Sequence, residues 1–171
     1  MSEARVAIVM GSISDYEVMA SGAKILADLD VPYEVKVMSA HRSPAVVADY
    51  VSGAEGRGLE IIIAAAGGAA HLAGAVAAHT RLPVIGVPLV ATAMGGMDAL
   101  LATVQMPGGV PVATMGCGKW GAINAAHFAA RILALGDADI AANVVANRAT
   151  QTENVNRMQA QLEEKLAADG L

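Results

Sequence analysis

Five short apolar runs, each followed by a small or polar turn and then by a helix-like stretch, constrain the fold of this chain more than any other feature. The first run, Val6 to Met10, is continuously apolar and ends at Gly11, as expected of a strand buried on both faces of a parallel sheet. The later runs predict strands over Tyr33 to Met38, Leu59 to Ala65, Val84 to Val87 (ended by Pro88) and Val110 to Met115.

The stretches between and after these runs predict helices. The first follows Gly11 and continues to about Leu29, with Ser14 or Asp15 as its N-cap. The others are expected over Ala45 to about Gly56, Leu72 to about Thr80, Asp98 to Met106, Trp120 to about Leu135, and Asp139 to about Ala168. Parallel strands joined by helical crossovers give a three-layer α/β fold.

The chain has no internal repeat or linker, so residues 1–171 are expected to form one domain. Within it, residues 139–171 form a C-terminal helical extension. Its second half, Asn147 to Gln161, is polar and has little apolar surface to bury on its own. We therefore expect this helix to reach a neighbouring subunit.

Composition points the same way. With 55% hydrophobic and only 16% charged residues, the chain has more apolar surface than a monomer of this size would hide, which predicts a homo-oligomer. A net charge of −5 argues against nucleic-acid or anionic-membrane partners. The single cysteine, Cys117, and an N-terminal apolar run too short for a signal peptide predict a cytoplasmic protein.

One uncharged stretch, Ile61 to Ala78, is long enough to cross a bilayer. It is interrupted by Gly67-Gly68 and His71, and most of its later apolar residues are alanines. We interpret it as a buried strand, a glycine turn and a buried helix, and expect no membrane partner.

Three of the turns carry chemistry at the carboxyl ends of predicted strands, where ligands bind in open α/β sheets. A phosphate suits the two serine hydroxyls and the backbone amides at the first helix start, with a guanidinium beside them. Asp15 is better suited to ribose hydroxyls, and His41 can move a proton. The turns bring together Ser12, Ser14 and Asp15; Ser39, Ala40, His41 and Arg42; and Gly67, Gly68 and His71.

These residues also have structural interpretations. On this alternative interpretation, Ser14 and Asp15 do no more than cap a helix, and Ser43-Pro44 is an ordinary helix start. His71 would then be a structural histidine. His79, His127 and Cys117 are interpreted as structural residues. Because no Cys/His cluster has metal-ligand spacing, we expect no metal site.

A second glycine motif, Gly116 to Gly121, matches the dinucleotide pattern GxGxxG after a strand and before a helix. The acidic residues at the required distance, Asp137 and Asp139, precede a helix instead of ending a strand, and Lys119-Trp120 is bulky for a phosphate turn. A dinucleotide site is therefore the weaker alternative here.

Taken in order, several motifs resemble those of the class I branch of the AIR carboxylase family, the N5-carboxyaminoimidazole ribonucleotide mutases of purine (IMP) biosynthesis. The resemblance covers nearly the whole chain and implies a flavodoxin-like domain assembled as a homo-octamer, with no cofactor. The motifs are Val9 to Ser12 with Ser14-Asp15, Ser39 to Pro44, Ala66 to Leu72, Gly86-Val87-Pro88, Val104 to Pro107, and Gly109 to Val112.

The resemblance also implies roles for the residues. Ser12, Asp15 and Arg42 would hold the ribose phosphate, assisted by Ser14, and His41 would be the general acid and base. The glycine-rich loop at Gly95-Gly96 is a candidate lid. Around the imidazole ring and carboxylate of the ribonucleotide substrate would lie Ser39, Ala40, Gly67, Gly68 and His71.

Two positions depart from the family pattern, and two other functions stay open. Ala99 stands where the family usually has serine, and Gly116 to Trp120 differs from the commoner Ala-Ile-Gly-Lys-Ala, which affects expectations for loop closure and packing. The alternatives are a class II AIR carboxylase that uses free carbon dioxide, and a non-catalytic nucleotide-binding module on the same kind of fold.

Overall fold

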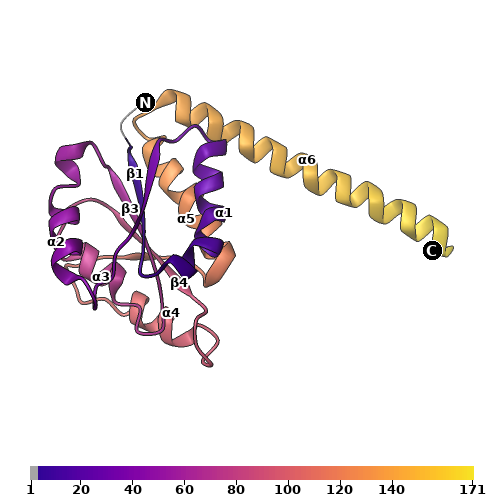
Figure 1. The fold of residues 1–171 in the computed structure, drawn as a ribbon. Helices are drawn as coiled ribbons and strands as arrows, with labels where there is room; N and C mark the ends of the chain where they lie inside the picture. Colours follow the sequence, from indigo (N-terminus) through magenta and orange to yellow (C-terminus); the bar gives the residue numbers. More distant parts are fainter. Residues whose placement is uncertain (1–3) are drawn as a thin grey trace.

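The computed structural model describes residues 4–171 and has a five-stranded parallel sheet at its centre (Figure 1). The order is β2-β1-β3-β4-β5, the flavodoxin-like arrangement in which the chain changes direction between β1 and β3. The strands are β1 (Val6–Met10), β2 (Tyr33–Val37), β3 (Ile61–Gly67), β4 (Val84–Leu89) and β5 (Ala113–Thr114). The expected three-layer α/β fold is confirmed.

Helices cover both faces of the sheet. Figure 1 shows α1 and α5 on one face, α2 and α3 on the other, and α6 projecting away from the domain. The chain also forms two short 3-10 turns, η1 (Ile13–Asp15) and η2 (Glu55–Arg57). The helices are α1 (Tyr16–Asp28), α2 (Pro44–Ser52), α3 (Leu72–Ala77), α4 (Met97–Val104), α5 (Gly118–Leu133) and α6 (Ala138–Asp169).

The central strands divide their side chains between two cores. In β1, Val6, Ile8 and Met10 face α1 and α5, whereas Ala7 and Val9 face α2 and α3. All five side chains of β1 are buried. This two-sided burial explains why the run is continuously apolar and lacks the alternation of a half-exposed strand.

The layer formed by α1 and α5 is thin because small residues line the contact. A Cβ added at Gly22 in α1 would lie 2.6 Å from the carbonyl oxygen of Ala122 in α5. Ala125, Ala126 and Ala129 of α5 are also fully buried. The scarcity of aromatic residues is thus matched by backbones that approach each other closely.

Several predicted boundaries were wrong by a few residues, and two of the differences have a clear cause. Pro88 does not end β4; it lies within the strand, paired with Ala66 of β3. On its other side β4 pairs with β5 only at Ile85 and Gly86, so the missing N–H of Pro88 interrupts no ladder. The fifth strand is only two residues long, and Pro111 precedes it without a donor.

The last helix, α6, spans 32 residues and leaves the domain soon after it starts. Asp137 caps its first turn by accepting from the amides of Asp139 and Ile140, and Ile140 is its one fully buried residue. From residue 151 to the end every side chain is exposed. Within residues 4–171, no helix combines the length and apolarity needed to cross a bilayer.

Candidate active site

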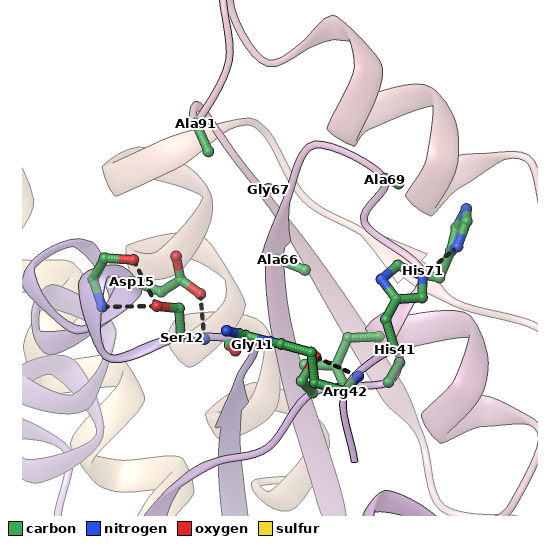
Figure 2. Close-up of a pocket in the computed structure, with 14 residues that line it drawn as sticks. Gly11, Ser12, Asp15, His41, Arg42, Ala66, Gly67, Ala69, His71 and Ala91 are labelled. Atoms are coloured by element: carbon green, nitrogen blue, oxygen red, sulfur yellow. Dashed lines mark hydrogen bonds between the residues drawn. The ribbon is translucent and has the colours of Figure 1, made fainter. Parts of the chain in front are cut away.

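One cavity of about 340 Å³ lies at the carboxyl ends of β1, β2, β3 and β4, at the point where the strand order reverses (Figure 2). The volume falls within the range typical of small-molecule sites, roughly 300–1,000 Å³. The turns that the sequence predicted to meet do meet here. The lining residues are Gly11, Ser12, Ser14, Asp15, Ser39, Ala40, His41, Arg42, Ala66, Gly67, Ala69, His71, Leu72 and Ala91.

Every predicted site residue lines this cavity except Gly68. Its φ of +62° identifies a left-handed backbone position, so its contribution is to the turn rather than to the wall. Five lining residues were not predicted: Gly11, Ala66, Ala69, Leu72 and Ala91. Ala91 follows β4, and the rule that placed the other three turns at this edge could have found it.

The first turn is stabilised by a capping box, and this differs from the predicted cap. Ser12 is the N-cap: its Oγ accepts from the amide of Ser14 at 3.3 Å, and Asp15 Oδ2 accepts from the amide of Ser12 at 3.0 Å. Asp15 itself precedes α1 without a side-chain capping bond. The amides expected to bind a phosphate are therefore partly used by the turn. Ser14 Oγ donates to Ser12 Oγ at 2.8 Å, so the Ser12 hydroxyl is the free donor of the two.

Arg42 connects the first and second turns. Its Nη2 donates to the carbonyl oxygen of Gly11 at 2.6 Å, and its Nε lies 3.3 Å from Ser39 Oγ, which also accepts from the Arg42 amide. The guanidinium has five N–H donors, so these bonds leave donors for an anion. The Arg42 guanidinium shares this end of the cavity with Ser12 and Ser14, and together these groups have the chemistry to bind an anion.

Among residues 4–171, Asp15 is the only carboxylate that lines the cavity. Burial raises the pKa of its carboxyl, while the Ser12 amide and the Arg42 charge act in the opposite direction. A carboxylate that accepts a backbone bond on one oxygen has acceptor capacity left for hydroxyl groups of a ligand.

His41 and His71 meet at the other end of the cavity. Their Nε2 and Nδ1 atoms are 2.8 Å apart, and the rings are nearly perpendicular, with an interplanar angle of 83° (Figure 2). His41 belongs to the turn after β2, whereas His71 occupies the N-cap position of α3. The pair combines two turns that are 30 residues apart in the sequence.

The wall between the two ends is backbone. A Cβ on Gly67 would lie 2.5 Å from the Cβ of Ala91, so β3 and the chain after β4 can approach only because residue 67 is glycine. Together with Ala66 and Ala69, this surface lacks projecting side chains. A flat ring can therefore lie against it, between the guanidinium and the imidazoles.

The other residues considered in the sequence lie elsewhere. His79 is exposed and His127 is half-buried on α5, and neither lines the cavity. The Gly116 to Gly121 turn starts α5, and a Cβ on Gly121 would lie 1.7 Å from the carbonyl oxygen of Gly116, so packing accounts for that glycine. Across residues 4–171, no three His, Cys, Asp or Glu residues are grouped in a way that could hold a metal ion.

Comparison with known proteins connects this geometry to a family. The model of the AIR carboxylase family matches residues 5–154. Proteins named N5-carboxyaminoimidazole ribonucleotide mutase are similar over most of their length: that of Bacillus subtilis is 53% identical over 150 residues, covering 88% of this chain and 93% of that protein. The Pseudomonas aeruginosa protein of that name is 52% identical, covering 89% and 93%.

The same name belongs to a Mycobacterium tuberculosis protein that is 54% identical over 142 residues, covering 83% of this chain and 80% of that protein. Among solved structures, the crystal structure of Treponema denticola PurE superimposes with a TM-score of 0.81 at 27% identity, covering 92% of this chain and 97% of that one.

Proposed function

The chain belongs to the AIR carboxylase family, and from this premise we propose that it is an N5-carboxyaminoimidazole ribonucleotide mutase of purine biosynthesis. It would move a carboxylate from the exocyclic nitrogen of aminoimidazole ribonucleotide to carbon 4 of the ring. The observation that supports this most is the single cavity in which an anion-binding end, a flat backbone wall and an imidazole pair occur in that order.

The ribonucleotide would bind with its phosphate at Arg42 and the hydroxyls of Ser12 and Ser14. Charge-assisted hydrogen bonds from a guanidinium suit phosphate, and Arg42 is already held in place by Gly11 and Ser39. Asp15 would accept hydrogen bonds from the ribose hydroxyls, next to the phosphate. The imidazole ring and the carboxylate would then lie between Ser39, Ala40, the Gly67-Gly68 turn and His71.

His41 would handle the protons. The N–C bond of the carbamate breaks, carbon dioxide leaves, and the exocyclic nitrogen gains a proton from His41. Carbon 4 then forms a bond to the retained carbon dioxide, and the proton leaving carbon 4 returns to His41. Protons and charge balance over the cycle, so the proposal requires no cofactor and no metal.

The released carbon dioxide has to stay inside a closed cavity, because confinement gives it the high effective concentration at which carbon 4 captures it quickly. The segment between β4 and α4, residues 90–96, is the proposed lid. It continues from Ala91 on the cavity wall and contains Gly95 and Gly96, both with positive φ. Thr92 donates to Asp98 at 2.6 Å across the segment, which gives it a defined shape.

Both departures from the family pattern lie beside this proposed lid. Ala99 is fully buried in the first turn of α4. Cys117 Sγ lies 3.8 Å from the carbonyl oxygen of Gly96. They would affect how the lid is held without altering the groups that bind phosphate or carry protons.

The proposal includes a cytoplasmic homo-octamer with α6 extending onto a neighbouring subunit. Large apolar side chains on several elements support self-association: Trp120 on α5 is 81% exposed, and Met97 and Leu101 on α4 are also exposed. A second copy of this chain is the partner that such surfaces would need.

The direct test of the mechanism is His41→Asn, assayed for turnover and for binding of the product nucleotide. We expect binding within about threefold of the parent and a loss of at least about a hundredfold in kcat, the usual contribution of a general acid–base group. His79→Asn, an exposed histidine outside the cavity, is the matched control and should retain parent activity. Turnover near the parent rate in His41→Asn would contradict the role of His41.

Labelled bicarbonate separates the two enzyme alternatives. Efficient incorporation into aminoimidazole ribonucleotide, without the carbamate substrate, would identify a class II carboxylase. A nucleotide-binding module predicts instead that the parent protein binds the ribonucleotide and turns over neither substrate. The relatives named as mutases, 53% and 52% identical over most of the chain, favour the mutase.

A further inference from the structure

The contact between His41 and His71 supports an inference about how the proton carrier is controlled, and it rests on the proposed function. We propose that His71 is a positioning residue: it accepts a hydrogen bond from His41 Nε2 and thereby reserves His41 Nδ1 for the substrate. The motivating observation is the 2.8 Å distance between His41 Nε2 and His71 Nδ1.

The direction of the bond follows from what His41 must do. As a general acid and base it alternates between a neutral and a protonated ring, and the protonated ring carries hydrogen on both nitrogens. A bond from His41 Nε2–H to His71 Nδ1 is compatible with both states. The reverse bond, from His71 Nδ1–H to His41 Nε2, is compatible only with neutral His41 and would have to break in every cycle.

This direction also settles the tautomers. In the neutral state that follows proton donation to the exocyclic nitrogen, His41 keeps its proton on Nε2, so Nδ1 has the free lone pair that takes the proton from carbon 4. His71 stays neutral, with its own proton on Nε2. When His41 becomes charged, His71 stabilises the charge through the same bond, without taking the proton itself, as the orienting carboxylate does in a hydrolase triad.

The surroundings leave His71 free for this role. It occupies the N-cap position of α3, yet its side chain makes no capping bond, so the ring is available to His41. The charged groups sharing the cavity wall are Asp15 and Arg42, which are bonded to Ser12 and to Gly11 and Ser39. The titratable residues of the neighbouring α2, Asp49 and Tyr50, do not line the cavity.

The test compares His71→Leu with His71→Asn. Leucine removes the acceptor, whereas the amide oxygen of asparagine can occupy the position of Nδ1. We expect His71→Leu to lower kcat about 10- to 100-fold, by analogy with the loss of a partner that orients a metal-bound histidine, with KM within about threefold. His71→Asn should recover kcat to within about fivefold of the parent. A raised KM with unchanged kcat in His71→Leu would make His71 a substrate contact only and overturn the proposal.

A spectroscopic measurement tests the bond without relying on turnover. In protein labelled with 15N at histidine Nδ1 and prepared at alkaline pH, so that the imidazole rings are neutral, solid-state NMR should give a pyridine-type Nδ1 signal for His41, assigned by its loss in His41→Asn. In His71→Leu the signal should split toward a mixture of tautomers. A pyrrole-type Nδ1 signal for His41 in the parent, or no change in the His41 signal in His71→Leu, would refute the proposed bond. If the parent protein lacks mutase activity, the proposed function fails while this measurement still decides the pairing.

Discussion

Arg42, Ser12 and Asp15 each serve the fold and the cavity together. Arg42 joins the first two turns through Gly11, and the capping box of Ser12 and Asp15 shapes the turn that places both of these side chains on the cavity wall. Such residues are held in position before a ligand arrives, so less order remains to be imposed on binding. Replacing any of them would therefore change both the shape of the site and its chemistry.

His127 shows a residue-scale effect away from the site. Burial lowers its pKa below the ordinary value of 6.5, and the charge of Arg131, one helical turn later, lowers it further. Because the folded-state pKa lies below the unfolded value, the unfolded chain binds the proton more readily at low pH. The contribution of His127 to the free energy of unfolding should therefore be fully present above about pH 6.5 and be lost as the pH drops below it.

We predict that His127→Gln makes the protein less sensitive to acid. Tm measured at pH 7.5 and at pH 5.5 should differ less in this variant than in the parent, because the buried titratable ring is gone. His79→Gln, at an exposed histidine, should retain the parent difference. Equal pH sensitivity in His127→Gln and the parent would show that this ring does not control acid stability.

At the scale of elements, the layer of α1 and α5 depends on close backbone contact. Gly22 faces the carbonyl oxygen of Ala122, which as a backbone atom cannot rotate away. The contact also explains how a chain with 3% aromatic residues fills its core, since small side chains allow the helices to approach the sheet and each other.

We predict that Gly22→Ala lowers the free energy of unfolding by about 1–3 kcal/mol, the usual cost of overpacking, despite the better helix propensity of alanine. Gly56→Ala is the matched control, because a Cβ there meets nothing within 4 Å and its φ is not positive. Urea unfolding of both variants would measure the difference. A Gly22→Ala variant as stable as Gly56→Ala would contradict the close contact of α1 and α5.

At the scale of the whole molecule, the chain exposes more surface than a compact monomer. Its accessible area is 9459 Å², whereas a monomer of 17.3 kDa would have about 7,800 Å² by the usual scaling. The projecting part of α6 contributes to this excess (Figure 1). Residues 155–171 also lie beyond the match to the family model, which ends at residue 154.

The end of α6 carries an apolar stripe. Val155, Met158, Leu162 and Leu166 recur every three or four residues and therefore share one face of the helix. All four are exposed in the single chain. A helix with such a face is marginal in water unless something covers it, and a neighbouring subunit is the proposed cover.

We predict that Met158→Gln combined with Leu162→Gln reduces self-association, while leaving the domain folded. Light scattering coupled to size-exclusion chromatography should give a lower mass than for the parent. The control pair, Ala160→Gln with Glu164→Gln, lies on the opposite face of α6 and should leave the mass unchanged. An unchanged mass in both double variants would exclude this stripe from subunit contact.

Several features were determined by the sequence alone, because they depend on neighbours along the chain. The continuous apolar run of β1, the apolar run and glycine turn of β3, and the tail helix follow from local periodicity and turn chemistry. The gathering of the polar turns at one edge also followed, since parallel strands bring their carboxyl ends together.

Other features were decided only by the tertiary structure. Pro88 could remain inside β4 because β5 is too short to need its N–H, and the close approach at Gly67 exists because residue 91 lies opposite. The pairing of His41 with His71 depends on the strand order and on the orientation of the two rings. Local sequence constrains backbone conformation one residue at a time, whereas these contacts arise between segments whose spacing is set by the packed sheet and helices.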